Sequence, residues 1–448
     1  MRSLLGRFHR PNARSQSEQL FMLNNLGDGS TLSLDFTTGV LDPRLTFTRS
    51  TTGTYINSSG YVTSAAINAP RFDYDPTALT PRGLLIEGSA SNLVTRSQTL
   101  NQAAWLKAAT TISETGTGSP ANDATSNLLT WTNGTAVGSA YTEQSSLAVS
   151  ASQPYTWSVW LKNRGNQRVS VFGFTKTSTN TFSGNLEMTV DFSVATPTAT
   201  ITTSTNFTST SVTTPVAFGN GWYRCTMTGT TPSTAAVTGF GISNKDAVPA
   251  SGTNGCEVWG AQLEAGSGAS SYIPTGASQG SRAADSCVMT GTNFSSWFAG
   301  ATEGVLYAEC ERPTKIPSPA TDHAIVGTRY ANGQGLWIYA SATNQYPSAY
   351  IFPTGGAQFA GGIATLIPLI NKQAVRWFDG NDITNFGSGT QGTTNTAGTG
   401  TMVPTMLTIG ANSTSGTEGN LEWLNGCIRR VKFWPTALPN AQIIALTT

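Results

Sequence analysis

Thr156-Trp157-Ser158-Val159-Trp160-Leu161-Lys162 is the stretch that decides the fold. Its residues alternate with period two, so Trp157, Val159 and Leu161 share one face of a strand and the intervening residues share the other. The same kind of pattern returns in the segments 168–174, 221–227 and 256–263. Short alternating strands separated by turn residues predict β-sandwiches or jelly rolls.

The composition agrees with this prediction and excludes several classes of protein. Charged residues make up 11% of the 448 residues, and the net charge is +1. An intrinsically disordered chain has few apolar residues and a high net charge, whereas this chain is 38% apolar with 11 Trp and 19 Phe. A nucleic-acid binder needs a broad basic surface, which a nearly neutral chain does not supply. No apolar run approaches the ~20 residues of a membrane span.

A second block of strands follows a small polar linker at 278–285. Its expected strands are 304–310, 335–340, 372–378, 406–410 and 426–434. Helical patterns occur in 17–24 and in 439–446, where Pro439 stands near a helix start. The sequence therefore predicts an all-β protein of tandem β-sandwich or jelly-roll domains. The expected parts are an extended N-terminal arm at 1–33, a collar plus jelly roll at 34–280 and a sandwich at 285–448.

The arm carries a basic tip, formed by Arg2, Arg7, Arg10 and Arg14. Two interpretations stay open: a frayed, solvated terminus, or an arm that docks on a larger assembly.

The five cysteines have wide spacings and no C-x-x-C pair, so we expect buried free thiols rather than disulfides or a zinc site.

Three stretches resemble motifs that recur in structural proteins of tailed bacteriophages and prophages. The first runs from Leu34-Asp35-Phe36 through Thr48-Arg49-Ser50, Pro70-Arg71-Phe72-Asp73 and Arg82-Gly83-Leu84-Leu85-Ile86-Glu87 to Asn92-Leu93. The second comprises Val258-Trp259-Gly260-Ala261-Gln262-Leu263-Glu264-Ala265-Gly266, Ser271-Tyr272-Ile273-Pro274-Thr275 and Arg282-Ala283-Ala284-Asp285. The third pairs Leu407-Thr408-Ile409-Gly410 with Asn425-Gly426-Cys427-Ile428-Arg429-Arg430-Val431.

The resemblance implies a jelly roll like a carbohydrate-binding module, followed by a concanavalin A-like or laminin-G-like lectin domain. It implies a virion protein, assembled in the host cytoplasm: a tail fibre, a baseplate appendage or a capsid decoration that attaches to a host-surface glycan. Its expected partners are other virion proteins, reached through the arm, and further copies of itself. Two alternatives stay open, a glycan-cleaving tail enzyme and a purely structural spacer or cement protein.

Charged residues gather in the first motif, although the chain is otherwise poor in charge. Arg49, Arg71 and Arg82 stand among carboxylates, which are Asp35, Asp73, Asp75 and Glu87. Fixed Arg–carboxylate pairs would orient this extended segment against the jelly roll. The alternative is a set of unpaired surface charges.

The residues do not predict an enzyme. The two histidines are His9, in the basic tip, and His323, which is too few for a His-rich metal site and leaves His323 alone for a triad. The pairs Asp379/Asp382 and Glu418/Glu422 lie at turns, which favours solvation over glycoside hydrolysis. We expect no cofactor; the alternative is a calcium ion held by the oxygens of Asp379, Asn381 and Asp382.

Sugar binding requires exposed aromatic rings beside polar groups. The candidates are Trp337, Tyr339 and Trp377, which lie on strands near the Gly/Thr/Asn-rich segment 387–401. Trp131 and Trp160 are further candidates. The alternative for each is a place in a sandwich core, where most tryptophans lie.

Overall fold

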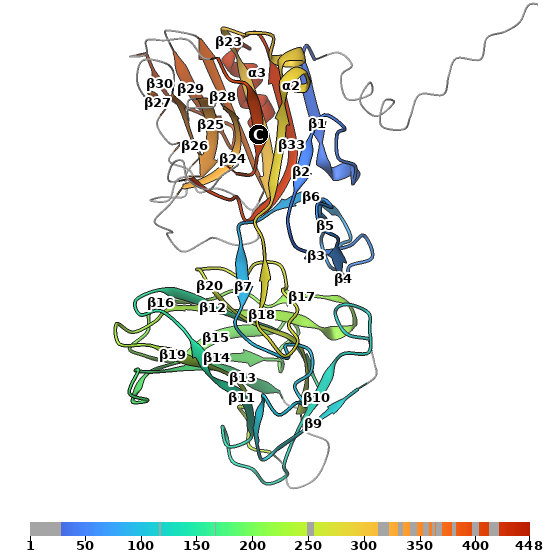
Figure 1. The fold of residues 1–448 in the computed structure, drawn as a ribbon, viewed down its shortest axis with the longest axis vertical. Coiled ribbons are helices and arrows are strands. Elements are labelled where there is room, and N and C mark those ends of the chain that lie inside the picture. Colours follow the sequence, from blue (N-terminus) through green and yellow to red (C-terminus); the bar gives the residue numbers. More distant parts are fainter. Residues whose placement is uncertain are drawn as a thin grey trace, which may run out of the picture.

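The computed structural model describes residues 28–115, 118–165, 167–248, 255–311, 322–329, 335–340, 347–352, 358–360, 363, 370–378, 382–396, 403–411 and 421–448. Within these residues the fold is all-β with several antiparallel sheets, as predicted. Figure 1 shows two β-sandwiches following one another along the long axis of the molecule. None of the helices in the described part of the chain has the length and apolar character needed to cross a membrane.

The terminal sandwich, shown at the top of Figure 1, contains both the first and the last strands of the described chain. Its first sheet has the order β30 (Thr390–Asn395), β29 (Ile383–Gly387), β28 (Ile370–Phe378), β23 (Glu303–Glu311), β33 (Gly426–Trp434), β6 (Pro81–Ile86) and β5 (Phe72–Tyr74), with β1 (Leu32–Asp35) also paired to β33. Its second sheet has the order β2 (Thr46–Thr48), β22 (Ser286–Thr290), β31 (Met406–Ile409), β24 (Asp322–Arg329), β25 (Gly335–Ala340), β26 (Pro347–Phe352) and β27 (Gln358–Ala360), with β32 (Leu421–Glu422) on β24.

The insert sandwich, shown at the bottom of Figure 1, comprises strands β8 to β20. Its proximal sheet, which faces the terminal sandwich, has the order β16 (Thr208–Val212), β18 (Tyr223–Thr230), β12 (Pro154–Asn163), β20 (Gly255–Ala265), β10 (Asn127–Trp131) and β9 (Thr110–Glu114), with β17 (Val216–Ala217) on β18. Its distal sheet has the order β15 (Thr198–Thr205), β14 (Phe182–Asp191), β13 (Arg168–Lys176), β19 (Val237–Asn244), β11 (Tyr141–Ala148) and β8 (Leu106–Ala108).

The domain boundaries differ from the expected ones because the N-terminal strands pair with the last strand. Leu32 lies opposite Phe433, and Leu34 lies opposite Val431, in the β1–β33 ladder. Strand β6 extends the same ladder, with Leu84 opposite Ile428. Residues 34–86 were expected as a collar on the jelly roll, yet their apolar strands β1, β2 and β6 complete the core of the terminal sandwich. The insert sandwich therefore interrupts a discontinuous terminal sandwich.

Two short antiparallel strands form a neck between the sandwiches. Strand β7 (Ala90–Asn92) leads into the insert sandwich and pairs with β21 (Gly280–Arg282), which leads out of it. The buried Asn92 amide donates to the carbonyls of Ala261 and Ile273, 3.0 Å away in each case. Its side-chain oxygen accepts from the Leu263 N–H. Asn92 therefore ties the neck to β20.

Each sandwich has its own apolar core. The core of the insert sandwich is drawn from residues between Val94 and Leu263 and includes Trp157, Val159 and Leu161, the face that the opening stretch predicted. A third cluster joins Val62, on the hairpin of β3 (Gly53–Ile56) and β4 (Val62–Ala65), to aromatic residues of the proximal sheet.

Helices are short and rare. The predicted C-terminal helix is confirmed as α3 (Asn440–Thr447), whereas the expected helix at 17–24 lies outside the described residues. Sequence reasoning missed α2 (Gly291–Phe298), which is too short to show a clear helical period and buries Phe294, Trp297 and Phe298. The 3-10 turns are η1 (Phe36–Thr38) and η2 (Gly219–Gly221).

The prediction of buried free thiols is confirmed, and all of them lie on strands: Cys225, Cys256, Cys287, Cys310 and Cys427.

Candidate functional site at the junction of the sandwiches

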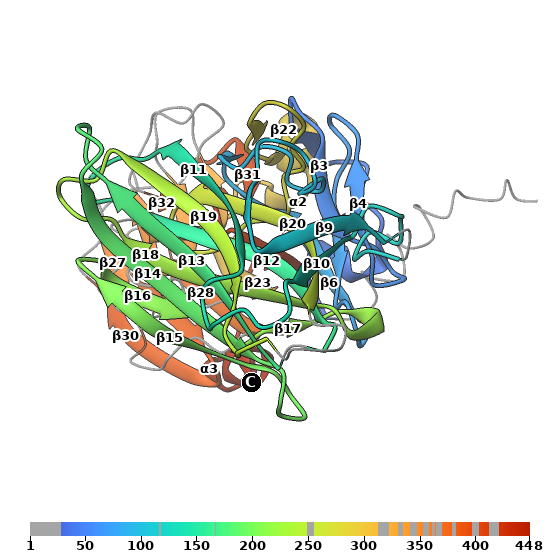
Figure 2. The ribbon, with the colours of Figure 1, turned by 90° about the horizontal axis from the view of Figure 1, so that it is seen from below.

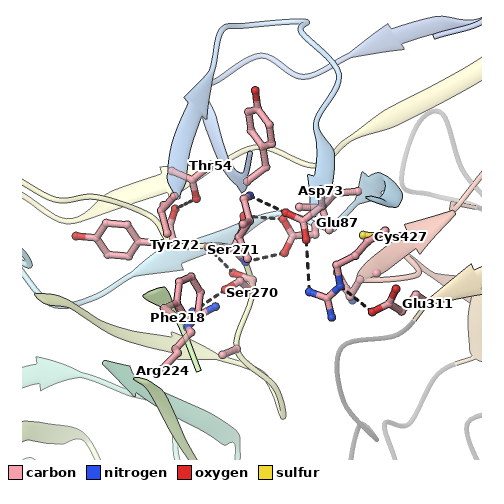
Figure 3. Close-up of a pocket in the computed structure, with 18 of the residues that line it drawn as sticks. Thr54, Asp73, Glu87, Phe218, Arg224, Ser270, Ser271, Tyr272, Glu311 and Cys427 are labelled. Carbon is pink, nitrogen blue, oxygen red and sulfur yellow. Dashed lines mark hydrogen bonds and ion pairs between the residues drawn. The ribbon is translucent and has the colours of Figure 1, made fainter. Parts of the chain in front are cut away.

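A cavity of about 100 Å³ lies where the two sandwiches meet. Its lining comes from the β3–β4 hairpin, from β5 and β6, from the proximal sheet, from segment 269–272 and from the strands that carry Glu311 and Cys427. Figure 3 shows that the polar lining side chains are largely bonded to one another. The cavity is thus surrounded by parts of the chain that are far apart in sequence.

A buried group of charges, the junction cluster, lies beside this cavity and comprises Arg49, Arg71, Glu87, Arg282 and Asp285. Arg71 is completely buried and contacts two carboxylates, Glu87 at 2.6 Å and Asp285. Arg49 binds the other oxygen of Asp285 at 3.2 Å, and Arg282 lies 3.3 Å from Glu87. One continuous chain of ion pairs therefore joins residues that precede the insert sandwich in the sequence to residues that follow it.

The backbone and small side chains complete the hydrogen bonding of the cluster. Glu87 accepts from the Ser271 N–H and hydroxyl, both at 2.7 Å, and the Glu87 N–H donates to Asp285. Arg71 also donates to the Thr54 carbonyl at 2.9 Å. These contacts tie the cluster to the β3–β4 hairpin and to the segment that leaves the insert sandwich.

The electrostatics of the cluster favour ionised carboxylates. Burial alone would raise the pKa of Glu87, but the positive charges of Arg282 and Arg71 outweigh it and lower that pKa to about 2. A buried ion pair of this kind costs desolvation free energy, so its net contribution to stability is small, yet removal of one partner is costly. The cluster fixes one arrangement of the chain rather than adding much stability.

A second set of pairs continues the network toward the terminal sandwich. Arg82 donates to Glu311 at 2.7 Å and lies 3.5 Å from Asp73. Burial raises the pKa of Asp73 to about 6, although the carboxylate accepts from the Ile56 N–H. Asp73 is therefore the group in the network whose charge is least well compensated.

Aromatic rings close the cavity on the side of the insert sandwich. Trp160 packs edge-on against Phe218, Trp259 and Tyr272. The guanidinium of Arg224 lies 4.5 Å from the centre of the Trp160 ring and donates to the Ser270 carbonyl. This wall explains the second motif physically, because Trp259 and Tyr272 pack against the hairpin that the first motif supplies.

The arrangement has the features of a lock between domains rather than of a catalytic centre. Pockets for small molecules usually have volumes of about 300–1,000 Å³, well above the volume of this cavity. Glu87, Asp285 and Glu311 are all engaged by arginines. Burial raises the pKa of the Cys427 thiol well above its usual range, which disfavours the nucleophilic thiolate.

Arg71 pairs with Glu87 and Arg82 with Asp73, as predicted, whereas Arg49 pairs with Asp285, outside the predicted carboxylates. Asp35 pairs instead with Arg430, at 3.1 Å. Sequence reasoning missed Arg282 and Asp285, which it placed in a polar linker, although both are buried. A signal was present, because two opposite charges stand three residues apart in a segment otherwise made of small residues.

The predicted sugar-binding rings are buried. Trp377 has no exposed surface and stacks in the core on Phe433, while Trp337 and Tyr339 are 1% and 4% exposed. Trp131 and Trp160 are buried as well. A sugar can stack only on an exposed ring face, so these residues form no such platform; the expectation failed because large rings on sandwich strands gain most free energy in the core.

Several other predicted sites fall largely outside the described residues. Asp379 and Asn381 of the calcium hypothesis lie there, whereas Asp382 is described and its carbonyl accepts from the Phe378 N–H. The docking residues Arg2, Arg7, Arg10 and Arg14 also lie outside the described residues. Among the residues that the structure describes, no group of three or more His, Cys, Asp or Glu is arranged to hold a metal ion. His323 is buried, and its Nδ1 lies 2.8 Å from the Trp423 carbonyl.

Comparisons with known proteins give only distant similarities. No family model and no curated protein matches the chain. The CBM40 module of the Ruminococcus gnavus IT-sialidase, bound to alpha2,3 sialyllactose, is similar over 33% of this chain and 84% of its own, with 12% identity and a TM-score of 0.27. The leech intramolecular trans-sialidase, complexed with 2,7-anhydro-Neu5Ac, is similar over 34% of this chain and 24% of its own, with 13% identity and a TM-score of 0.28.

The receptor-binding domain of the botulinum neurotoxin C/D mosaic serotype is similar over 37% of this chain and 40% of its own. Its identity is 8% and its TM-score 0.29. Similarities at this level carry no functional assignment, so the proposals below rest on the residues of this chain.

Proposed function

We propose that this protein is a non-catalytic structural component of a tailed-bacteriophage particle that attaches to glycans of the host surface. Its place on the particle would be a tail fibre, a baseplate appendage or a capsid decoration. The observation that carries the proposal is the junction cluster. The residues through which the sequence resembles phage appendage proteins, above all Arg71, Glu87 and Asp285, form this buried cluster, and Glu87 also accepts two hydrogen bonds from Ser271 of the segment that leaves the insert sandwich.

The lock suits an appendage, because a projecting part must hold its outer domain in a fixed direction. The neck alone consists of two short strands and would allow the insert sandwich to bend. Buried ion pairs with complementary geometry favour one orientation over others, and this specificity is their best-supported role. Many fixed copies on one particle would also let individually weak glycan sites act together.

Two features support a non-catalytic role over a glycan-cleaving enzyme. The buried carboxylates of the junction are neutralised by arginines, and the cavity between the sandwiches is too small for a sugar chain. A glycosidase needs two carboxyl groups separated by about 5–10 Å on either side of a scissile bond. The described residues at the junction offer no such open pair.

Localisation on intact particles tests the proposal. Particles are induced from the bacterium that encodes the gene, purified on a density gradient and labelled with antibody and gold against this protein. We expect regular labelling at one location on each particle. Recovery of the protein only in the cell fraction, and never with particles, would contradict a virion role.

The two alternatives are tested with the same purified protein. Release of reducing ends from the host polysaccharide would favour a glycan-cleaving tail enzyme. Particles that contain the protein, but adsorb to host cells equally well without it, would favour a spacer or cement protein.

A further inference from the structure

The distal face is the outer surface of the distal sheet of the insert sandwich. Figure 1 places this sheet below β12, β18 and β20, farther from the terminal sandwich, at a level that β9 and β10 of the proximal sheet also reach. Figure 2 looks onto it from below, with β11, β19, β13, β14 and β15 side by side. If the terminal sandwich lies toward the particle, this face lies at the host-facing end of the described chain, together with β9 and β10.

The alternation of buried residues shows which side chains lie on the distal face. On β13, Val169 and Val171 belong to the core, so Phe172 and Phe174 point outward. On β19, Phe240 and Ile242 belong to the core. The residues that alternate with them, Gly239 and Gly241, are therefore on the outer face.

The two outward phenylalanines lie over these two glycines. Phe172 is directly opposite Gly241 in the ladder, and a Cβ atom at Gly241 would lie 2.0 Å from the Phe172 ring. A Cβ atom at Gly239 would lie 2.3 Å from the Phe174 ring. Because no side chain separates ring from backbone, both rings are half-buried and lie flat on the sheet.

Polar groups that make no hydrogen bond within the described residues stand next to Phe172. Tyr141 packs edge-on against it with ring centres 6.3 Å apart. Glu143 is directly opposite Gly241 on the other side. Glu143 is half-buried, and the charge of Lys176 partly compensates its carboxylate. Within the described part of the chain, however, neither this carboxylate nor the Tyr141 hydroxyl makes a hydrogen bond.

Glu187 on the same face provides the contrast. It accepts hydrogen bonds from Ser170 and Lys245, each at 2.6 Å. Burial raises the pKa of Glu143, whereas the bonds to Glu187 more than offset its burial and lower its pKa. A partly desolvated carboxylate without a donor costs free energy unless a ligand supplies the donor.

We propose that the distal face binds a neutral saccharide, with a sugar ring stacked on Phe172 and its hydroxyls bonded to Glu143 and Tyr141. An exposed ring beside hydrogen-bonding groups recognises the apolar face and the hydroxyl edge of a pyranose together. Charged side chains around the rings are Glu143, Glu187 opposite Phe172, Lys176 over the Phe174 ring, and Lys245 bonded to Glu187, and their charges sum to zero. This balance suits an uncharged sugar, and the inference rests on the proposed role in glycan attachment.

A structural role for the rings is the competing explanation, because aromatic side chains can cover glycines in a sheet and stabilise it. That role explains Phe172 and Phe174 but gives no reason for a half-buried Glu143 that has no hydrogen-bond donor among the described residues. The test therefore centres on Glu143, whose substitution by Gln keeps its size and leaves the glycines covered.

The full-length protein is displayed in many copies on beads and offered soluble neutral polysaccharides, namely a glucan, a mannan and a galactan, with hyaluronan as an anionic comparison. We expect at least one neutral polysaccharide to be retained and hyaluronan to be released. Glu143→Gln should weaken retention about tenfold, the scale of one hydrogen bond to a charged group, without lowering the melting temperature. Phe172→Leu should abolish retention.

Phe182→Ala is the matched control, because Phe182 is 57% exposed at the start of β14 and lies opposite Lys176 rather than Phe172. It should bind like the wild type. The site is overturned if no neutral polysaccharide is retained, or if Glu143→Gln and Phe172→Leu both bind like the wild type. It is also overturned if the protein self-associates in sedimentation and Glu143→Gln abolishes this self-association. The last result would make the distal face an interface between copies.

The outcome is separable from that of the proposed function. Wild-type protein that binds host cells, together with Glu143→Gln and Phe172→Leu variants that bind equally well, would leave glycan attachment in place and overturn the distal site alone. Absence of the protein from particles would overturn the virion role whatever the distal face binds.

Discussion

Arg71 has no exposed surface and holds two carboxylates that come from different parts of the chain, Glu87 and Asp285. Substitution by Met keeps much of the side-chain volume but leaves both carboxylates with fewer partners in a buried site. Removal of one member of a buried ion pair costs about 3–5 kcal/mol. We therefore expect Arg71→Met to lower the free energy of unfolding by this amount, measured by urea denaturation.

Arg168→Ala is the control for Arg71→Met, because Arg168 is half-exposed where it pairs with Asp246. Exposed pairs contribute about 0–1 kcal/mol, so this variant should unfold nearly like the wild type. Equal effects of the two substitutions would show that the junction cluster has no special role.

Asp73 gives the junction a pH dependence of a defined sign. Its pKa is raised from 3.8 to about 6 in the folded protein, so folding favours the protonated form. Its contribution to stability is present below pH 4 and is lost as the pH rises through about 6. Asp73→Asn should therefore become more stable relative to the wild type across this range, by about 3 kcal/mol at most, as measured by urea denaturation at several pH values.

Glu87→Gln provides the opposite sign as an internal check. The pKa of Glu87 is lowered from 4.5 to about 2, so its contribution to stability is present above pH 4.5 and is lost as the pH falls toward 2. This variant should be less stable than the wild type at neutral pH and approach it in acid. Parallel pH profiles for the two variants would refute the assignment of charges at the junction.

At the scale of elements, strands β1, β2, β5 and β6 from residues 28–86 are part of the terminal sandwich. Its core includes apolar side chains from this segment, namely Leu32, Leu34, Phe36, Phe47, Leu84 and Ile86. Full burial of one such side chain contributes about 1.5–3 kcal/mol, so their loss removes on the order of 10 kcal/mol. That is comparable with the whole stability of a domain.

We therefore expect a fragment of residues 285–448 not to fold alone, while a fragment of residues 88–280 folds as an independent sandwich. Circular dichroism melting of both fragments checks this. Adding a peptide of residues 28–87 should restore cooperative melting to the first fragment, since it supplies β1, β2, β5 and β6. A cooperative transition of 285–448 without that peptide would contradict the discontinuous domain.

At the scale of the whole molecule, the basic arm is the proposed connection to the particle. Among the described residues, both cores are formed from Leu32 onward, so we expect deletion of residues 1–20 to leave the melting temperature unchanged. Incorporation into particles should be abolished, as measured by immunoblotting of purified virions from a strain carrying only the truncated gene. Normal incorporation of the truncated protein would refute docking through the arm.

The alternation in the strands was enough to predict an all-β fold, and the excess of opposite charges in the first motif was enough to predict Arg–carboxylate pairs. Both signals are local, because strand periodicity and charge composition are visible in a short window. The helix α2 was missed since eight residues scarcely exceed two helical turns, and tertiary packing of Trp297 and Phe298 stabilises it.

The sequence by itself therefore determined the fold class, the faces of individual strands such as β12, and the residue types that meet at the junction. The tertiary structure alone decided which strands belong together, because the β1–β33 ladder joins residues about 400 positions apart and no local pattern encodes such a pairing. It also decided that Trp377 is core and that Phe172 is only partly buried. Both are aromatic residues on alternating strands, and only the packing of a second sheet onto one face distinguishes a buried ring from an accessible one.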